Sequence, residues 1–183
     1  MANVDRLRNI AIVGPHHGGK TTLVEAILSK TGAVGRRGSV SDGTTVTDHE
    51  PEDVAHVQST SVGFAHFSSD GIDVTIADCP GFVDFFAETK AVLRGVDAAI
   101  VVIEADPQRV VQCKATVDFL ETLRLPHIFV VNKMDRPGAD FGATLAALQD
   151  AYGRHVVAEQ LPIGNAEQFE GYIDLAERKA WKF

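Results

Sequence analysis

The chain has 183 residues, of which 45% are hydrophobic and 23% charged, and its formal net charge is −8 at pH 7. This composition is typical of one folded domain, or of one domain with part of another, and it excludes a wholly disordered chain. The acidic balance argues against direct nucleic-acid or anionic-membrane binding by this segment, but it leaves open a large ribonucleoprotein partner contacted by other parts of a longer protein.

Targeting and redox features are few. The longest apolar run, residues 98–103, is too short to span a bilayer, and the N-terminal residues contain no signal-peptide core. Cys79 and Cys113 form no CxxC pair and no metal-ligand spacing with histidines. We therefore expect a reduced, cytoplasmic protein with no membrane segment.

Apolar runs alternate with helical patterns through most of the chain. The Asp70-Gly71 pair between two alternating runs predicts a hairpin, Pro107 is suited to the first position of a helix, and Cys113 falls on that helix's apolar face. In chain order the patterns predict a strand over 9–14, a helix over 20–32, a hairpin over 61–77, a helix over 84–95, a strand over 98–105, a helix from 107, a strand over 127–132 and a helix over 139–153.

This order predicts an α/β fold with a mostly parallel sheet covered on both faces and one antiparallel edge hairpin. About thirty polar residues between the first helix and the hairpin have weak periodicity, which is typical of a functional or mobile loop. The tail differs in pattern: 156–164 and 169–175 read as short strands, the chain then stops at ERKAWKF, and nothing follows to pair with them. We expect a fragment that ends inside a second unit.

The stretch GPHHGGKT, residues 14–21, fits the phosphate-loop pattern G-x-x-x-x-G-K-[ST] between a strand and a helix. Glycines let the backbone wrap tightly, so that N–H groups and the helix N-terminus can bind phosphate, while Lys20 reaches the β and γ phosphates and the Thr21 hydroxyl binds Mg²⁺. Adjacent histidines rarely converge on one ion, so we interpret His16 and His17 as loop residues near phosphate rather than as a metal site. We assign phosphate binding to Gly14, His16, His17, Gly18, Gly19, Lys20, Thr21 and Thr22.

Two further motifs complete a nucleotide site. Asp78 ends an apolar strand and is placed to bind Mg²⁺ through water, and the Gly81 N–H is placed to face the γ phosphate. NKMD, residues 132–135, follows the strand over 127–132. Asp135 can accept hydrogen bonds from the ring N–H and exocyclic amine of guanine, a pair that adenine lacks; Asn132 braces the loop and the Lys133 stem covers the base. The three motifs together predict binding of GTP and GDP with Mg²⁺.

These motifs resemble a known family. The phosphate loop, DCPGFVDF (78–85) and VNKMDRPGADF (131–141) are similar to the GTPase domain of translation elongation factor G, and the tail from 161 to 181 resembles the start of the subdomain inserted in that domain. The resemblance implies a P-loop NTPase fold of three α/β/α layers, GTP hydrolysis, and the ribosome as partner through a longer, multidomain protein that we take to be a monomer. It also implies a GTP-binding domain over 1–154 and an incomplete inserted subdomain over 155–183. The family's last guanine motif, a Ser-Ala turn, lies beyond this chain.

The sequence departs from the family at working positions. The usual phosphate loop reads G-H-x-D-x-G-K-T, and the usual first switch carries R-G-I-T-[IV]. Counting back from Asp78 places residues 56–60 at that switch, so Ser59 retains a hydroxyl for the metal, with Thr60 as the second choice. Phe82 replaces the histidine that positions the attacking water in the family.

Phenylalanine has no hydrogen-bonding group, and positioning is nearly all that phosphoryl transfer needs from a protein. We assign catalysis to Lys20, Gly81 and Phe82, and predict tight nucleotide binding with hydrolysis that is slow unless another group acts: Arg36, Arg37 or the ribosome. We interpret the two arginines first as a solvated basic pair, and Phe82 could also be a simple packing anchor. Two functions follow: a ribosome-stimulated GTPase, or a hydrolysis-impaired module whose switches dock on the ribosome when GTP is bound. NKMD argues against a third, ATP-using enzyme.

Overall fold

The computed structural model describes residues 4–48 and 59–183, which divide into two compact units. The first unit comprises Met1–Val102 and Ala115–Val130, and the second comprises Ile103–Lys114 and Val131–Phe183. The chain passes from the first unit to the second within β4 (Ala98–Glu104), returns after Lys114, and passes to the second unit again within β5 (His127–Asn132). Within the described ranges, no helix combines the length and apolar character needed to cross a membrane.

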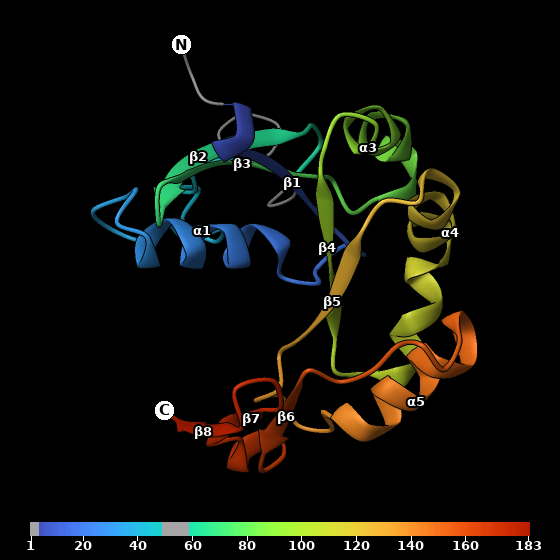
Figure 1. Cartoon of the computed structure of the whole chain (residues 1–183). Helices are drawn as coiled ribbons and strands as arrows, with labels where there is room; N and C mark the ends of the chain where they lie inside the picture. Colours follow the sequence, from blue (N-terminus) through green and yellow to red (C-terminus); the bar gives the residue numbers. More distant parts are fainter. Residues whose placement is uncertain (1–3, 49–58) are drawn as a thin grey trace. The chain divides into compact units, whose positions relative to one another are not determined.

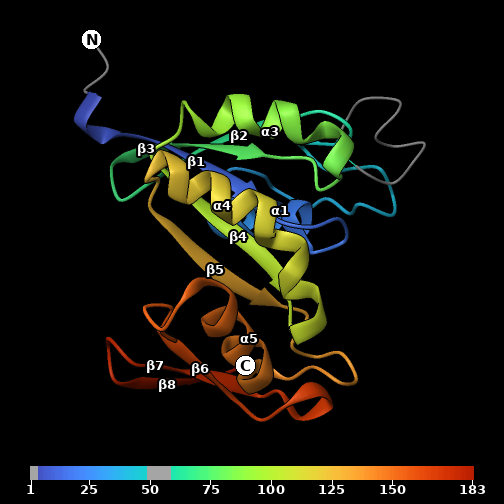
Figure 2. The ribbon, with the colours of Figure 1, turned by 90° about the vertical axis from the view of Figure 1, so that its right-hand side faces the viewer.

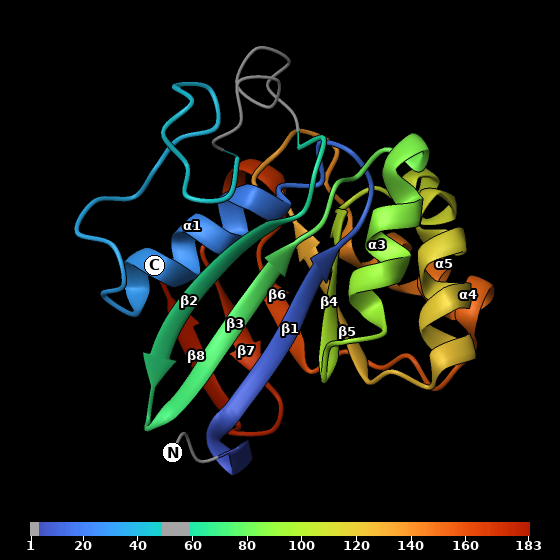
Figure 3. The same ribbon diagram turned by 90° about the horizontal axis from the view of Figure 1, so that it is seen from above.

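Five strands form the main sheet in the order β2-β3-β1-β4-β5. β1 pairs in parallel with both β3 and β4, whereas β2 and β3 form the antiparallel hairpin predicted at the edge (Figure 3). The strands are β1 (Leu7–Val13), β2 (Gly63–Ser69), β3 (Ile72–Asp78), β4 (Ala98–Glu104) and β5 (His127–Asn132).

Helices cover both faces of this sheet in the first unit (Figure 1). Ile10 and Ile12 of β1 pack against Val24 and Leu28 of α1, and because successive side chains of a strand alternate, Ala11 faces the opposite side. That side is covered by α3, which contacts β1, and α3 lies beside α4 (Figure 2) through an edge-to-face contact of Phe86 and Phe119. The helical elements are η1 (Val4–Arg6), α1 (Lys20–Lys30), η2 (Val83–Phe85), α3 (Phe86–Leu93) and α4 (Lys114–Leu123).

One helical prediction needs correction. The segment that begins at Pro107 is a 3-10 helix, η3 (Pro107–Cys113), and only then continues as α4. Asp106 caps η3 by accepting a hydrogen bond from the Gln108 N–H at 2.9 Å. Cys113 is fully buried, as its helical spacing indicated.

In the second unit, α5 (Phe141–Tyr152) begins at its cap Asp140, which accepts from the Ala143 N–H at 2.9 Å. A separate antiparallel sheet follows, in the order β6-β7-β8. Its third strand was missed in the sequence, because Arg178 at φ 55° turns the chain so that KAWK pairs with β7. The expectation that nothing pairs with the tail strands was therefore wrong. The elements are β6 (Gln160–Ile163), η4 (Ala166–Gln168), β7 (Gly171–Asp174) and β8 (Lys179–Lys182).

Candidate functional site

The phosphate loop connects the end of β1 to the start of α1. Gly14 lies there at φ 139°, and a Cβ on it would be 2.1 Å from the Val102 carbonyl oxygen, so only glycine fits. The Gly18 N–H donates to the Pro15 carbonyl at 3.1 Å, and Gly19 forms the cap of α1. The loop thus closes tightly and brings its backbone to a helix N-terminus, as anion binding requires.

Lys20 is buried, and its Nζ donates to the Pro15 carbonyl at 3.2 Å inside the loop. Gly81, at the end of β3, approaches the same place: a Cβ on Gly81 would be 2.5 Å from the Lys20 Nζ and 2.7 Å from the His16 backbone nitrogen. This contact follows from the parallel pairing of β1 with β3, which continues beyond the strands as the Cys79 N–H donates to the Ile12 carbonyl at 3.0 Å. The predicted phosphate residues Lys20 and Gly81 are therefore neighbours.

Asp78 is almost fully buried beside the loop. Its Oδ2 accepts from the Thr47 hydroxyl at 2.8 Å, while its Oδ1 is buried without a hydrogen-bond partner. Burial raises the pKa of Asp78 to about 6, against the opposing effects of the Thr21 and Thr47 hydroxyls and the Lys20 ammonium. A buried carboxylate with one unsatisfied oxygen is a suitable ligand for a divalent cation.

Thr21 and Ser59 both hydrogen-bond Asp48, a residue that the sequence motifs did not indicate. The Thr21 hydroxyl donates to Asp48 Oδ2 at 3.2 Å, and the Ser59 hydroxyl donates to Asp48 Oδ1 at 2.7 Å. Thr21 and Asp48 are buried, and Asp78 lies close enough to Asp48 for their charges to repel. Two carboxylates and two hydroxyls form a hard oxygen donor set, which fits Mg²⁺.

A buried glutamate holds the segment that carries Asp48. Glu25 of α1 is 1% exposed and accepts from the Gly38 N–H at 2.7 Å and from the Val46 N–H at 2.6 Å. These bonds connect the loop 38–48 to the helix that follows the phosphate loop. The only signal in the sequence is a glutamate on the otherwise apolar face of α1, one turn after Thr21.

Phe82 contacts a histidine of the phosphate loop. Its ring packs on the His16 ring with centroids 3.9 Å apart and planes inclined by 37°, and the His17 ring lies 3.6 Å from that of His16 on centroids. Phe82 and His16 are both half-buried, whereas His17 is exposed at φ 61°. The position where the family has a histidine is thus covered by an imidazole from another segment.

The base motif lies in the second unit. The Asn132 carbonyl accepts from the Ala105 N–H at 3.0 Å, Met134 is buried, and Asp135 is exposed. Lys133 adopts φ 59°, and its Nζ donates to Glu104 Oε1. The motif is therefore fixed to the end of β4 by both backbone and side chain.

Glu104 is the centre of a small ionic network that the sequence did not indicate. Besides Lys133, Arg109 lies 3.0 Å and Arg136 3.9 Å from Glu104 Oε2. Burial alone would raise the pKa of Glu104, but the hydrogen bonds from Lys133 and Arg109 outweigh it and hold that pKa below its ordinary value.

The other predicted residues are placed less tightly. Thr22 is exposed on α1, and the exposed Arg37 donates to the Thr22 carbonyl at 3.2 Å, while Arg36 is exposed. Thr60 is half-buried. Positions 56–58 of the predicted first switch lie outside the described residues. Thr21 and Ser59 therefore share Asp48 as a hydrogen-bond partner.

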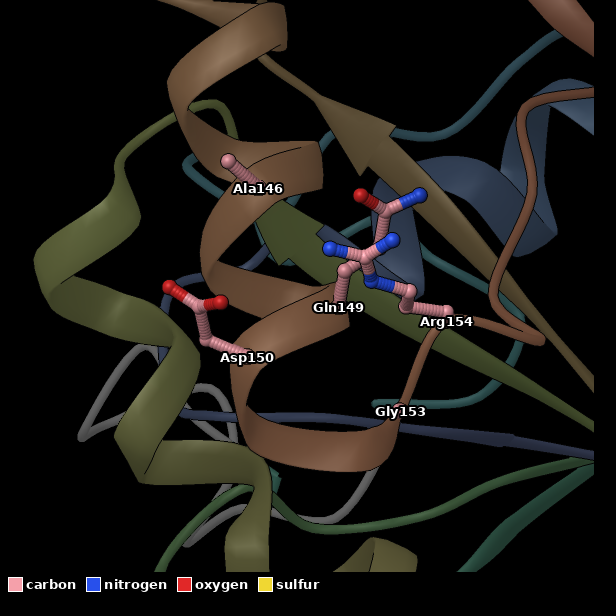
Figure 4. A pocket seen from close by; sticks show the side chains of 5 residues that line it. All are labelled: Ala146, Gln149, Asp150, Gly153 and Arg154. Atoms are coloured by element: carbon pink, nitrogen blue, oxygen red, sulfur yellow. The ribbon is translucent and has the colours of Figure 1, made fainter.

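A surface pocket lies apart from these residues, at the C-terminal turn of α5 in the second unit (Figure 4). The Gln149 amide there donates to the Val156 carbonyl at 2.9 Å, so this side chain is already engaged in holding the chain after the helix. The pocket is lined by Ala146, Gln149, Asp150, Gly153 and Arg154. It contains none of the predicted nucleotide or metal residues.

Comparison with known proteins agrees with this geometry. Residues 5–177 match the family model described as the Elongation factor Tu GTP binding domain. The chain is 40% identical over 179 residues to an elongation factor G-like protein of Synechocystis, covering 98% of this chain and 27% of that protein. It is 37% identical over 178 residues to elongation factor G of Petrotoga mobilis, covering 97% of this chain and 26% of that protein.

A crystal structure of a Thermus thermophilus protein matches with a TM-score of 0.89 at 38% identity, covering 96% of this chain and 26% of that one. This match confirms the predicted α/β P-loop fold with its mostly parallel sheet and edge hairpin. The chain spans about a quarter of the length of the curated relatives it matches. With its phosphate loop, its base motif and a family match over nearly all of its length, the chain belongs to the Elongation factor Tu GTP binding domain family.

Proposed function

We propose that this chain is the guanine-nucleotide domain of an elongation factor G-like translational GTPase, which binds GTP and GDP with Mg²⁺ and hydrolyses GTP slowly or only on the ribosome. The observation that carries the proposal is the close approach of Gly81 to Lys20 within a tightly closed phosphate loop. A γ phosphate bound there accepts from the Gly81 N–H and the Lys20 ammonium together.

Guanine recognition is assigned to Asn132, Lys133 and Asp135. The exposed Asp135 carboxylate accepts from the two N–H groups on the edge of guanine, and the anchored Asn132 backbone and Lys133 side chain hold the loop in one conformation. An adenine base offers that carboxylate neither of the two N–H donors, so we expect ATP to compete weakly.

Mg²⁺ binding is assigned to Thr21 and Asp78, with Ser59 brought near by Asp48. The unsatisfied Asp78 Oδ1 supports this assignment, because a bound cation and its waters give that oxygen a partner. Thr21 and Asp78 would hold the Mg²⁺, whose positive charge would offset the negative charge that develops on the phosphate oxygens.

The motif resemblance implies a histidine at position 82, where this chain has phenylalanine, and this difference bears on hydrolysis. Phe82 contributes no donor or acceptor for a water molecule. A second candidate function, a GTP-gated ribosome-binding module in which hydrolysis is impaired, is favoured by the same residue. We assign the ribosome as partner through the full-length protein, with a monomeric, cytoplasmic protein as the simplest state.

The first experiment measures binding of a fluorescent GDP to the full-length protein, with competition by GTP and ATP. We expect GTP to compete at least about 10²-fold better than ATP, because the wrong base leaves the polar groups of a hydrogen-bonding site unpaired. Asp135→Ala reduces this preference, whereas Asp150→Ala on α5 serves as a control of the same chemistry outside the site. Equal competition by ATP contradicts guanine specificity.

The second experiment measures multiple-turnover GTP hydrolysis with and without ribosomes. In the GTPase reading, the wild-type protein turns over on ribosomes, and Phe82→His changes its rate while leaving GDP affinity unaltered. In the binding-module reading, the wild-type protein binds GTP and ribosomes but remains slow under both conditions, and Phe82→His accelerates it.

A further inference from the structure

A histidine of the phosphate loop lies on the residue that replaces the family's switch histidine. Phe82 follows β3 and His16 follows β1, and these strands pair in parallel, with Ile12 opposite Asp78. Both chains continue beyond the sheet side by side, which places the two rings in contact at 3.9 Å between centroids. The contact between the two rings therefore follows from the parallel pairing of β1 with β3.

The backbone around this pair is tightly fixed. A Cβ on Gly81 would be 2.7 Å from the His16 backbone nitrogen, 2.8 Å from the His16 Cα and 2.5 Å from the Lys20 Nζ. The backbones of His16 and Gly81 and the Lys20 ammonium therefore pack directly against one another beside the loop. His16 is half-buried between the rings of Phe82 and His17, which limits the orientations its imidazole can adopt.

The chemistry of the two stacked rings is complementary. A neutral imidazole carries one nitrogen that accepts and one that donates a hydrogen bond, while phenylalanine carries neither. The Phe82 ring packs against the imidazole of His16, and His16 supplies the hydrogen-bonding nitrogens that phenylalanine lacks.

We propose that His16 positions the attacking water in GTP hydrolysis, in place of the switch histidine that Phe82 replaces. This inference rests on the proposed GTPase function. The water oxygen forms a bond to the γ phosphorus while the bond from that phosphorus to the bridging β–γ oxygen breaks, and GDP leaves with the electron pair. One hydrogen stays on the attacking oxygen, and the second proton passes to another oxygen of the released phosphate. His16 accepts a hydrogen bond from this water and so aligns it for in-line attack.

The test compares His16→Ala and His16→Phe in the full-length protein with ribosomes. His16→Phe retains an aromatic ring to pack on Phe82 and removes both nitrogens. We expect both variants to lower kcat by about 10²-fold, the order of loss for a misplaced reacting group, with GDP affinity within about threefold of wild type because backbone N–H groups bind the phosphates. His66→Ala, an exposed histidine on β2 of the same unit, serves as the control with unchanged turnover.

A rescue makes the test specific. Adding Phe82→His to His16→Ala returns an imidazole to the contact from the opposite chain, and we expect it to restore at least a tenth of the lost rate. A merely structural role for His16 predicts no rescue, because the second substitution does not rebuild its packing.

Other results overturn the inference. Wild-type turnover by His16→Phe means that only ring packing matters, and equal losses in kcat and GDP affinity mean that His16 supports the loop fold. A loss confined to His17→Ala assigns the role to the neighbouring histidine. Failure of the proposed function gives a different result: a wild-type protein that does not bind guanine nucleotide refutes the proposed function itself. A wild-type protein that binds GTP but does not turn it over on ribosomes overturns the His16 assignment and supports the GTP-gated ribosome-binding module.

Discussion

At the residue scale, Glu104 is the buried carboxylate on which the base motif depends. Its side chain is 11% exposed and faces Lys133, Arg109 and Arg136. Because the network lowers the pKa of Glu104, its stabilisation is fully present above the unfolded value of about 4.3 and is lost as pH falls through the lower folded pKa.

Glu104→Gln tests this prediction. We expect the variant to lose about 2 kcal/mol of unfolding free energy at pH 7, the range for hydrogen bonds to a charged group, and the difference from wild type to shrink as pH falls below about 4. Urea denaturation between pH 3 and 7 measures it, with Glu121→Gln on the exposed face of α4 as control. A difference that stays constant across this range contradicts an ionic role.

At the element scale, two side chains of α1, Glu25 and Thr21, hydrogen-bond the loop over 38–48. Glu25 accepts both the Gly38 and Val46 N–H groups, and the exposed Arg36 and Arg37 lie just before the first of these bonds. In Glu25→Gln an amide NH₂ faces one of the two N–H groups and loses that bond, so we expect the loop to open locally.

Trypsin cleavage after Arg36 and Arg37 reports this opening. We expect Glu25→Gln to be cut at least fivefold faster than wild type, and the Mg²⁺ concentration that half-saturates GDP binding to rise because Asp48 is no longer held near Thr21. Glu88→Gln on α3 is the matched control. Unchanged cleavage would mean that contacts other than Glu25 hold the loop.

The elements also show what sequence reasoning can reach. Phosphate and base motifs were predicted because each is a short contiguous stretch at a strand end, where local spacing already fixes the chemistry. Glu25, Asp48 and Glu104 were missed because their partners lie far along the chain, at Val46, Ser59 and Lys133, and no local pattern connects them. β8 was missed for the same reason: four residues of mixed character become a strand only when β7 provides the pairing.

At the scale of the whole molecule, the residues proposed to bind phosphate belong to the first unit and those proposed to bind the base belong to the second. GDP with Mg²⁺ at about 100 times its Kd should raise the unfolding free energy by about 2.7 kcal/mol, since it binds only the folded state.

We expect GDP with Mg²⁺ to slow amide hydrogen exchange both at residues 14–21 and at residues 132–135. Pyrophosphate with Mg²⁺, which has no base, should protect residues 14–21 alone. In Asp135→Ala, GDP should protect the phosphate loop at higher concentrations and lose its effect at 132–135. Protection of only the phosphate loop by GDP in the wild-type protein would refute the assignment of guanine to Asn132, Lys133 and Asp135.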